Sequence, residues 1–223
     1  MKEVERPPTL TAAVANAIRE SIMRGEMLPG AALREVELSK SLNTSRGTVR
    51  EALRELQKEN TVEVIPYRGA FVTRMTPEKV KEIYTLRALL EPYAVRLAME
   101  KNVYTNEDFS RLNEMVDEML EYETNDNYSE MVSTDMAIHH LLVEKCGHEL
   151  ILKTLQDLRA LTFLFIFSTK LYQSDMTRDD ASHKAIIDSV FSKNSVLAEQ
   201  VLRQHINEAG LSLLQRMNTY EKS

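Results

Sequence analysis

The feature that most constrains the fold is the helical patterning of the chain from residue 76 to its C-terminal end. Thr76 is a suitable N-cap, followed by Pro77 at the first helical position and Glu78 in the first turn. The 223-residue sequence has only 6 glycines and 6 prolines, a balance that favours helices. From residue 76 onward we predict only helices, at about 77–101 with a break near Pro92, 105–123, 127–146, 149–171, 177–193 and 195–219.

The first third of the chain shows three short helical patterns. Apolar residues recur at helical spacing over 9–24 and again over 34–42, and the sequence LPGAAL between them indicates a turn. Ser45 is a good N-cap for a third helix, RGTVREALRELQKEN, because its hydroxyl can accept from the free amides of the first turn. Asn60 can end this helix in a left-handed conformation.

A strand pair follows the third helix. TVEVI and AFVTR flank PYRG, which is a β-hairpin signal with Gly69 in the turn. Two helices, a turn, a third helix and a hairpin in this order predict a winged helix-turn-helix domain over residues 1–75. The expected fold is therefore mainly α, with this N-terminal domain and its small β-hairpin wing, and an all-α helical bundle over residues 76–223.

The charge of the chain is unevenly distributed. Residues 1–75 carry 12 lysines and arginines against 10 glutamates, a balance of +2, while the remainder has 16 basic and 24 acidic residues, a balance of −8. The first third can face a polyanion that the rest would repel. The single cysteine, the absence of an apolar N-terminal signal and an LTFLFIF run too short for a bilayer indicate a cytoplasmic protein without a membrane partner.

The third helix is predicted to read double-stranded DNA. A major groove admits one α-helix, and side chains near the helix N-terminus reach the base edges. The apolar face of SRGTVREALREL is used in the core, which leaves Arg46, Thr48 and Arg50 on the opposite side. Arginine suits bidentate contacts with guanine or phosphate. The alternative is a solvated face whose arginines pair with Glu51 and Glu55.

Two other parts of this domain can contact the duplex. Arg68 and Gly69 at the wing tip can approach a backbone or minor groove closely, and Arg34 at the start of the second helix can hold a phosphate. One reading helix touches too few bases for specificity, so we expect a homodimer on a palindromic operator.

Four motifs follow one another at close spacing in residues 10–74: G-x-x-x-P-G, L-x-E-x-x-L, S-R-x-x-V-R-E-A-L-x-x-L and R-G-x-F-V. In this order they resemble the N-terminal domain of the GntR family of bacterial transcription regulators. The resemblance implies that the DNA-contacting positions include Ser45, Arg46, Thr48, Arg50 and Gly69.

The helical part contains a set of inward-facing histidines. Asp135 and His139 lie four residues apart on one face that borders the core, and His183 and His205 lie in two later helical patterns with apolar neighbours. A single histidine of this kind is most often a hydrogen-bonded core residue. Several imidazoles and an acid together are costly to bury unless one divalent metal binds them all. Three imidazoles and one carboxylate suit Zn²⁺ first, and also Ni²⁺, Mn²⁺ or Fe²⁺.

The same region carries a second resemblance. The Arg87–Glu91 pair in LRALLEPYAVRLA, D-x-x-x-H at 135–139, S-H-K-A-I at 182–186 and H-I at 205–206 resemble the all-helical FCD effector domain of FadR-type GntR regulators. The resemblance implies a metal site. Its ligands would be Asp135, His139, His183 and His205, while His140 and His148 match no ligand position.

A metal in an effector domain can anchor a carboxylate or hydroxy-acid metabolite, or simply tie helices together. Arg87 and Arg159 are candidate cations for such an anion. The alternative is local pairing, of Arg87 with Glu91 and of Arg159 with Asp157, and for Arg159 we favour it. Of the two, Arg87 is therefore our predicted effector-binding residue.

We predict a ligand-responsive transcription regulator that binds a small organic acid and is not an enzyme. The chain has no H-E-x-x-H motif and no obvious paired general base beside the histidines. Two alternatives stay open at this point: a regulator that senses the metal itself, and a metal-dependent hydrolase.

Overall fold

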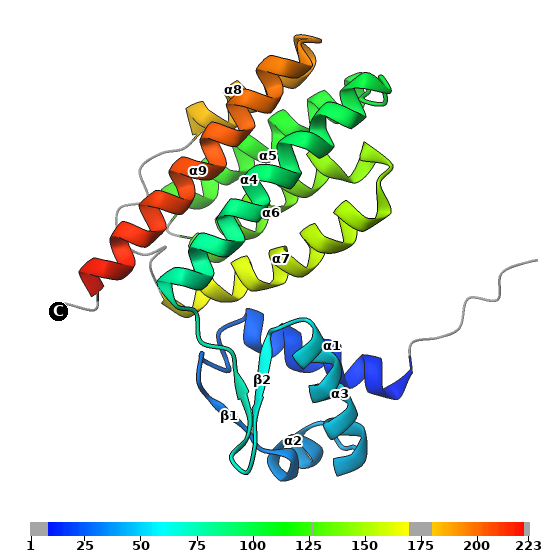
Figure 1. Cartoon of the computed structure of the whole chain (residues 1–223), viewed down its shortest axis with the longest axis vertical. Helices are drawn as coiled ribbons and strands as arrows, with labels where there is room; N and C mark the ends of the chain where they lie inside the picture. Colours follow the sequence, from blue (N-terminus) through cyan, green and yellow to red (C-terminus); the bar gives the residue numbers. More distant parts are fainter. Residues whose placement is uncertain (1–8, 126, 170–179, 221–223) are drawn as a thin grey trace, which may run out of the picture. The chain divides into compact units, whose positions relative to one another are not determined.

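The structure is a computed structural model that describes residues 9–125, 127–169 and 180–220. These residues divide into two compact units, one ending at Met75 and the other beginning at Thr76 (Figure 1). The fold is mainly helical with one small antiparallel sheet, as the sequence predicts. Within the described ranges, no helix combines the length and apolarity that crossing a membrane requires.

The N-terminal unit packs its helices around a small apolar core. Ser45 caps the third helix as predicted, because its side chain accepts a hydrogen bond from the Thr48 amide at 3.1 Å. Asn60 follows the same helix with a φ of 59°, the predicted left-handed conformation. Val49, Ala52, Leu53 and Leu56 form the buried face of that helix. The helices of this unit are α1 (Leu10–Met23), α2 (Glu35–Ser41) and α3 (Arg46–Lys58).

The wing is larger than the predicted hairpin. The strands β2 (Val62–Ile65) and β3 (Gly69–Val72) pair as expected, but β1 (Ala32–Leu33) adds a third strand on the other side of β3. The segment that we predicted as a turn, LPGAAL, therefore ends in a strand. Gly69, with a φ of 101°, begins β3, and the turn itself lies before it.

The C-terminal unit contains only helices within the described residues. Residues 170–171 and 177–179, at the ends of two predicted helices, lie outside them. The last turn of the helix predicted over 127–146 is a short 3-10 helix. The elements are α4 (Pro77–Glu100), α5 (Asn106–Thr124), α6 (Tyr128–Val143), η1 (Glu144–Cys146), α7 (Glu149–Thr169), α8 (Asp180–Phe191) and α9 (Ser195–Tyr220).

The predicted break near Pro92 is wrong, because α4 continues through it. Proline has no amide hydrogen to donate to the carbonyl four residues before it, which here is that of Ala88. The Arg203 guanidinium on α9 takes the place of that amide, with Nη1 donating to the Ala88 carbonyl at 2.7 Å. The helix therefore keeps its course because a side chain from another helix satisfies the carbonyl.

The packing of α4 against α9 sets the framework for the histidines. The two helices lie side by side in Figure 1 and form the most extensive helix pair of the unit. A Cβ atom on Gly210 would stand 2.8 Å from the Tyr84 side chain, so only glycine allows this close approach. Because α6 also packs against α4, and α8 against α9, the inward-facing residues of all four helices lie near one another.

Candidate metal centre and nucleic-acid interface

The four predicted metal ligands come together in the C-terminal unit. Asp135 and His139 lie one turn apart on α6, His183 lies on α8 and His205 on α9. One ligand atom from each of these residues lies within 4.8 Å of all the others. The three imidazoles are buried, whereas the Asp135 side chain is 29% exposed.

Neighbouring groups hold the imidazoles so that their Nε2 atoms face inward. Glu91 of α4 lies 2.6 Å from Nδ1 of His139, and the Ser182 hydroxyl lies 2.8 Å from Nδ1 of His205. Nε2 of His183 lies 2.8 Å from an Asp135 carboxylate oxygen. Glu91 and Ser182 lie outside the ligand set, and groups in that position fix the tautomer and orientation of metal-binding histidines.

The distances in the cluster fit a metal ion. Nε2 of His139 and Nε2 of His205 are 3.2 Å apart. Two nitrogens bound about 2.1 Å from one Zn²⁺ at a tetrahedral angle would be about 3.4 Å apart. The ionised Glu91 carboxylate can only accept from Nδ1 of His139, so a neutral His139 ring would present a lone pair at Nε2. When His205 donates its Nδ1 proton to Ser182, two lone pairs face each other, and a cation stabilises that arrangement.

The electrostatics of the cluster favour the protonation states that bind metals. Burial and the neighbouring imidazoles of His139 and His183 lower the pKa of His205 to about 2. Partial burial alone would raise the pKa of Asp135, but the hydrogen bond with His183 and the nearby imidazoles move it well below its usual range. A neutral imidazole beside an ionised carboxylate is the ligand form of both groups.

A cavity of about 320 Å³ borders the cluster at His139. It lies among residues of α4, α6 and α7 and includes apolar walls from Met136, Val143, Leu152 and Leu155. Its polar lining residues are Arg87, Glu91, His139, His140, Gln156 and Arg159. A small concave site with apolar walls and a few convergent polar groups is typical of a ligand site.

The two arginines that are candidates for binding an anion, Arg87 and Arg159, differ in whether an acidic side chain pairs with them. Arg87 is buried and its Nε donates to Glu91 at 2.5 Å, the local pairing that the sequence left as an alternative. Glu91 is ionised, because its burial is outweighed by Arg87 and His139, which lower its pKa to about 2. Arg159 also lines the cavity, and the expected pairing with Asp157 is absent from the ion pairs of the described residues.

The other two histidines lie outside the cluster. His140 is exposed, lines the cavity and lies 3.6 Å from Glu144. His148 lies before α7, where its Nδ1 accepts from the Ile151 amide at 3.4 Å. Neither joins the four ligands.

In the N-terminal unit, the predicted DNA-contacting side chains of α3 are available on its outer face. Arg46 and Arg50 are exposed, and the Thr48 hydroxyl lies 2.9 Å from that of Ser45. Arg50 makes a bidentate ion pair with Glu35 of α2, with nitrogen–oxygen distances of 2.6 and 2.8 Å. Arg46 makes no ion pair within the described part of the chain. Its guanidinium interacts with Glu35 only electrostatically, whereas the guanidinium of Arg50 is held by that carboxylate directly.

The remaining predicted contacts lie on α2 and the wing. Arg34, just before α2, pairs with Glu37 at 3.0 Å, and both side chains are well exposed. Arg68 lies over the Phe71 ring, 5.7 Å from its centroid, which fixes the arginine beside Gly69. Tyr67, which the sequence did not single out, is fully exposed at the wing tip with a φ of 64°.

Comparison with protein families assigns both units. The model of the FCD domain matches residues 82–208, and the model of the gntR family of bacterial regulatory proteins matches residues 10–72.

Individual relatives extend over nearly the whole chain. A Bacillus subtilis HTH-type transcriptional regulator, YdhC, is 28% identical over 92% of this chain and 91% of its own. The gluconate operon transcriptional repressor of the same species is 28% identical over 87% of this chain and 81% of its own. The crystal structure of a GntR transcriptional regulator from Rhodococcus sp. RHA1 has a TM-score of 0.79 and 25% identity, covering 92% of this chain and 97% of that one.

Proposed function

The chain is a bacterial DNA-binding transcription regulator of the GntR family with an FCD effector domain, and on this premise we propose that a divalent metal and a small carboxylate metabolite in that domain control its binding to an operator. Its domains and relatives are those of transcription regulators and not of enzymes, which removes the hydrolase alternative. Since an operator is part of the chromosome, the protein would work in the cytoplasm.

The observation that carries the metal proposal is the convergence of one carboxylate and three imidazoles within 4.8 Å. Asp135, His139, His183 and His205 would hold the ion, and Zn²⁺ suits this donor set first, with Ni²⁺, Mn²⁺ or Fe²⁺ as further candidates. A bound divalent ion would supply positive charge and a coordination position for a carboxylate oxygen of the effector.

The effector proposal is supported by the cavity beside His139. Arg87 lies in its wall and is the predicted effector-binding residue, although its Nε already binds Glu91. The name of one relative refers to a gluconate operon, and gluconate is a small carboxylate. The effector changes operator affinity only if it binds two arrangements of the protein with different affinities.

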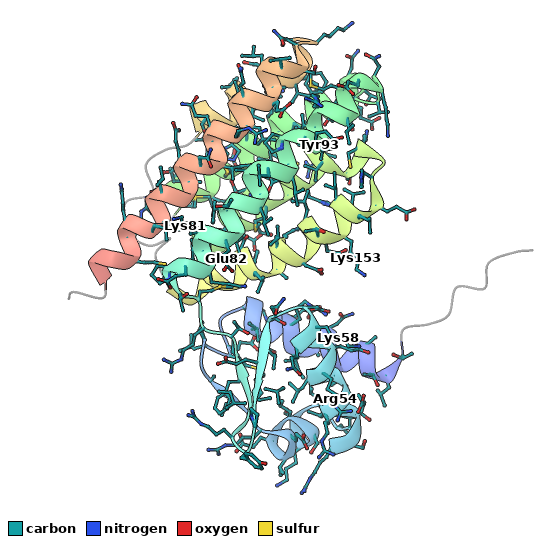
Figure 2. All side chains as sticks on the ribbon, viewed as in Figure 1. Arg54, Lys58, Lys81, Glu82, Tyr93 and Lys153 are labelled. Atoms are coloured by element: carbon teal, nitrogen blue, oxygen red, sulfur yellow. The ribbon has the colours of Figure 1, made fainter. Side chains whose placement is uncertain are left out.

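The DNA proposal assigns Ser45, Arg46, Thr48 and Arg50 to the reading helix, and Arg34, Arg68 and Gly69 to the phosphate and wing contacts. We propose a homodimer, because a two-fold protein matches a palindromic operator. An apolar stripe on α4 supports self-association. Leu86, Leu89 and Tyr93, at helical spacing, are 42%, 54% and 38% exposed, and Tyr93 is marked in Figure 2.

A comparison of two α3 variants tests the proposed function. Arg46→Ala is expected to lower the preference for the operator over unrelated DNA by about 1–3 kcal/mol, roughly 5- to 150-fold, because base contacts specify sequence. Lys58→Ala, at the far end of the same helix (Figure 2), should leave that preference unchanged. Fluorescence anisotropy at fixed salt gives both values. Equal preferences in the two variants would contradict this assignment of the reading face.

A further inference from the structure

Arg159 occupies an unusual place on α7. It is half-buried, it lines the cavity beside the metal cluster, and burial lowers the pKa of its guanidinium. Residues three or four positions away on a helix are those that can pair with it. At Arg159 these are Leu155, Gln156, Thr162 and Phe163, none of which is acidic.

The nearest acid in sequence does not neutralise Arg159. Asp157 is two positions away, so it projects from a different side of α7, and it is exposed. No ion pair or hydrogen bond joins Arg159 to any residue among those that the structure describes. A half-buried guanidinium without an anionic partner is costly, which makes it a candidate for binding an anion from outside the chain.

The fixed charges around the cavity indicate the charge of a ligand that would fit it. Arg87 and Glu91 form a buried pair at 2.5 Å and cancel each other. A divalent ion held by neutral imidazoles and the ionised Asp135 leaves one net positive charge at the His139 end. Arg159 adds a second positive charge from α7. A ligand that neutralises both sites therefore carries two negative charges.

We propose that Arg159 determines effector specificity by binding a second acidic group, so that the effector is a small dicarboxylic or hydroxy-dicarboxylic acid. This inference rests on the proposed function, since it takes the metal-bearing cavity as the effector site. One carboxylate faces the metal cluster at His139, and the other forms charge-assisted hydrogen bonds with Arg159. A monocarboxylate would leave the Arg159 charge unpaired.

The walls of the cavity also restrict the skeleton between the two acidic groups. Val143 from α6 and Leu152 and Leu155 from α7 are apolar, so they suit a short hydrocarbon chain. Gln156 and His140 are the polar lining residues that can bind a hydroxyl group. The volume of about 320 Å³ is at the small end of ligand sites, which suits a compact acid rather than a long-chain one.

The test uses matched acids and the full-length zinc-loaded protein. Calorimetry compares succinate with butyrate, glutarate with valerate, and malate with 2-hydroxybutyrate, so that each pair differs only in the second carboxylate. We expect the wild-type protein to bind at least one dicarboxylate about 10- to 100-fold more tightly than its partner, as a charged hydrogen-bonded pair allows. Arg159→Gln should abolish this preference, and Arg159→Lys should keep part of it.

Controls separate a local effect from damage to the fold. Lys153→Gln removes a charge from the same helix at an exposed position that does not line the cavity (Figure 2), and should keep the full preference. Zinc content and helicity are measured for every variant. Equal affinities for each pair of acids in the wild type, or an Arg159→Gln protein that keeps the preference, would overturn the inference. A wild-type protein that holds no zinc or ignores operator DNA would instead overturn the proposed function and this inference with it.

Discussion

Glu91 is a buried carboxylate of the C-terminal unit that contacts two other buried titratable side chains, those of Arg87 and His139. One carboxylate oxygen accepts from Arg87 at 2.5 Å, and the other lies 2.6 Å from Nδ1 of His139. The same side chain thus neutralises a buried guanidinium and fixes the orientation of a proposed metal ligand. A single substitution at this position should therefore affect both stability and metal affinity.

We predict that Glu91→Gln destabilises the protein by about 3–5 kcal/mol, because it removes one partner of a buried pair and leaves the charge of Arg87 uncompensated. Metal affinity should fall by about 10- to 100-fold, the usual effect of losing a group that orients a metal-binding histidine. Urea denaturation and competition with a chromogenic chelator measure the two effects.

The matched control is Glu82→Gln on the same helix (Figure 2). Glu82 pairs with Lys79 at 3.0 Å, but its side chain is 65% exposed. An exposed pair contributes only about 0–1 kcal/mol, so this variant should keep both stability and metal affinity. Similar behaviour of the two variants would mean that the buried Arg87–Glu91–His139 contacts have no special role.

At the residue scale, the sequence predicted the members of the cluster but not their surroundings. Asp135 and His139 could be identified because a four-residue spacing places them on one helical face. The contact between Glu91 and His139 joins residues 48 positions apart, which no local pattern encodes. The expected Arg159–Asp157 pair failed because residues two apart on a helix do not face each other.

At the scale of elements, α4 illustrates how tertiary contacts override a local signal. Proline inside a helix normally leaves a carbonyl without its donor and bends the chain. The break predicted near Pro92 is wrong because the Arg203 side chain supplies a donor to the Ala88 carbonyl, which no local pattern encodes. The loss of stability on substituting Arg203 should therefore depend on whether residue 92 is a proline.

We predict that Arg203→Met destabilises the protein by about 1–3 kcal/mol, because the Ala88 carbonyl becomes a buried acceptor without a partner. In a Pro92→Ala background the alanine amide can bond to Ala88, so the same substitution should cost less. Denaturation of the four proteins of this double-mutant cycle gives the coupling energy. Equal costs of Arg203→Met in both backgrounds would rule out this explanation of the continuous helix.

The short strand β1 marks the limit of element prediction from sequence. Ala32 and Leu33 are too few residues for an alternating pattern, and the preceding proline and glycine indicate a turn. Pairing with Phe71 and Ala70 of β3 creates the strand. The longer elements were predictable because each has many apolar residues at one period.

At the scale of the whole molecule, the proposed homodimer depends on the exposed stripe of α4. Leu89→Glu places a charge in the centre of that stripe, so we predict a rise of at least about 10-fold in the dimer dissociation constant, because burying an unpaired charge is costly. Analytical ultracentrifugation measures the change. Leu150→Glu on α7, where leucine is 72% exposed, is the control and should leave the dimer intact. Dimerisation unaffected by Leu89→Glu would exclude this face as the interface.

The central claim is that Asp135 and the three histidines hold a divalent ion on which the C-terminal unit depends. The most direct measurement is the metal content of gently purified protein, combined with its melting temperature before and after chelation. We predict about one ion per chain, and its removal should cost roughly 3–4 kcal/mol at a metal concentration 100 to 1,000 times the dissociation constant. The melting temperature should then fall by roughly 5–15 °C, recover when Zn²⁺ is restored, and show no such response in a His183→Gln protein. A metal-free wild-type protein whose melting temperature ignores both chelator and Zn²⁺ would contradict the account.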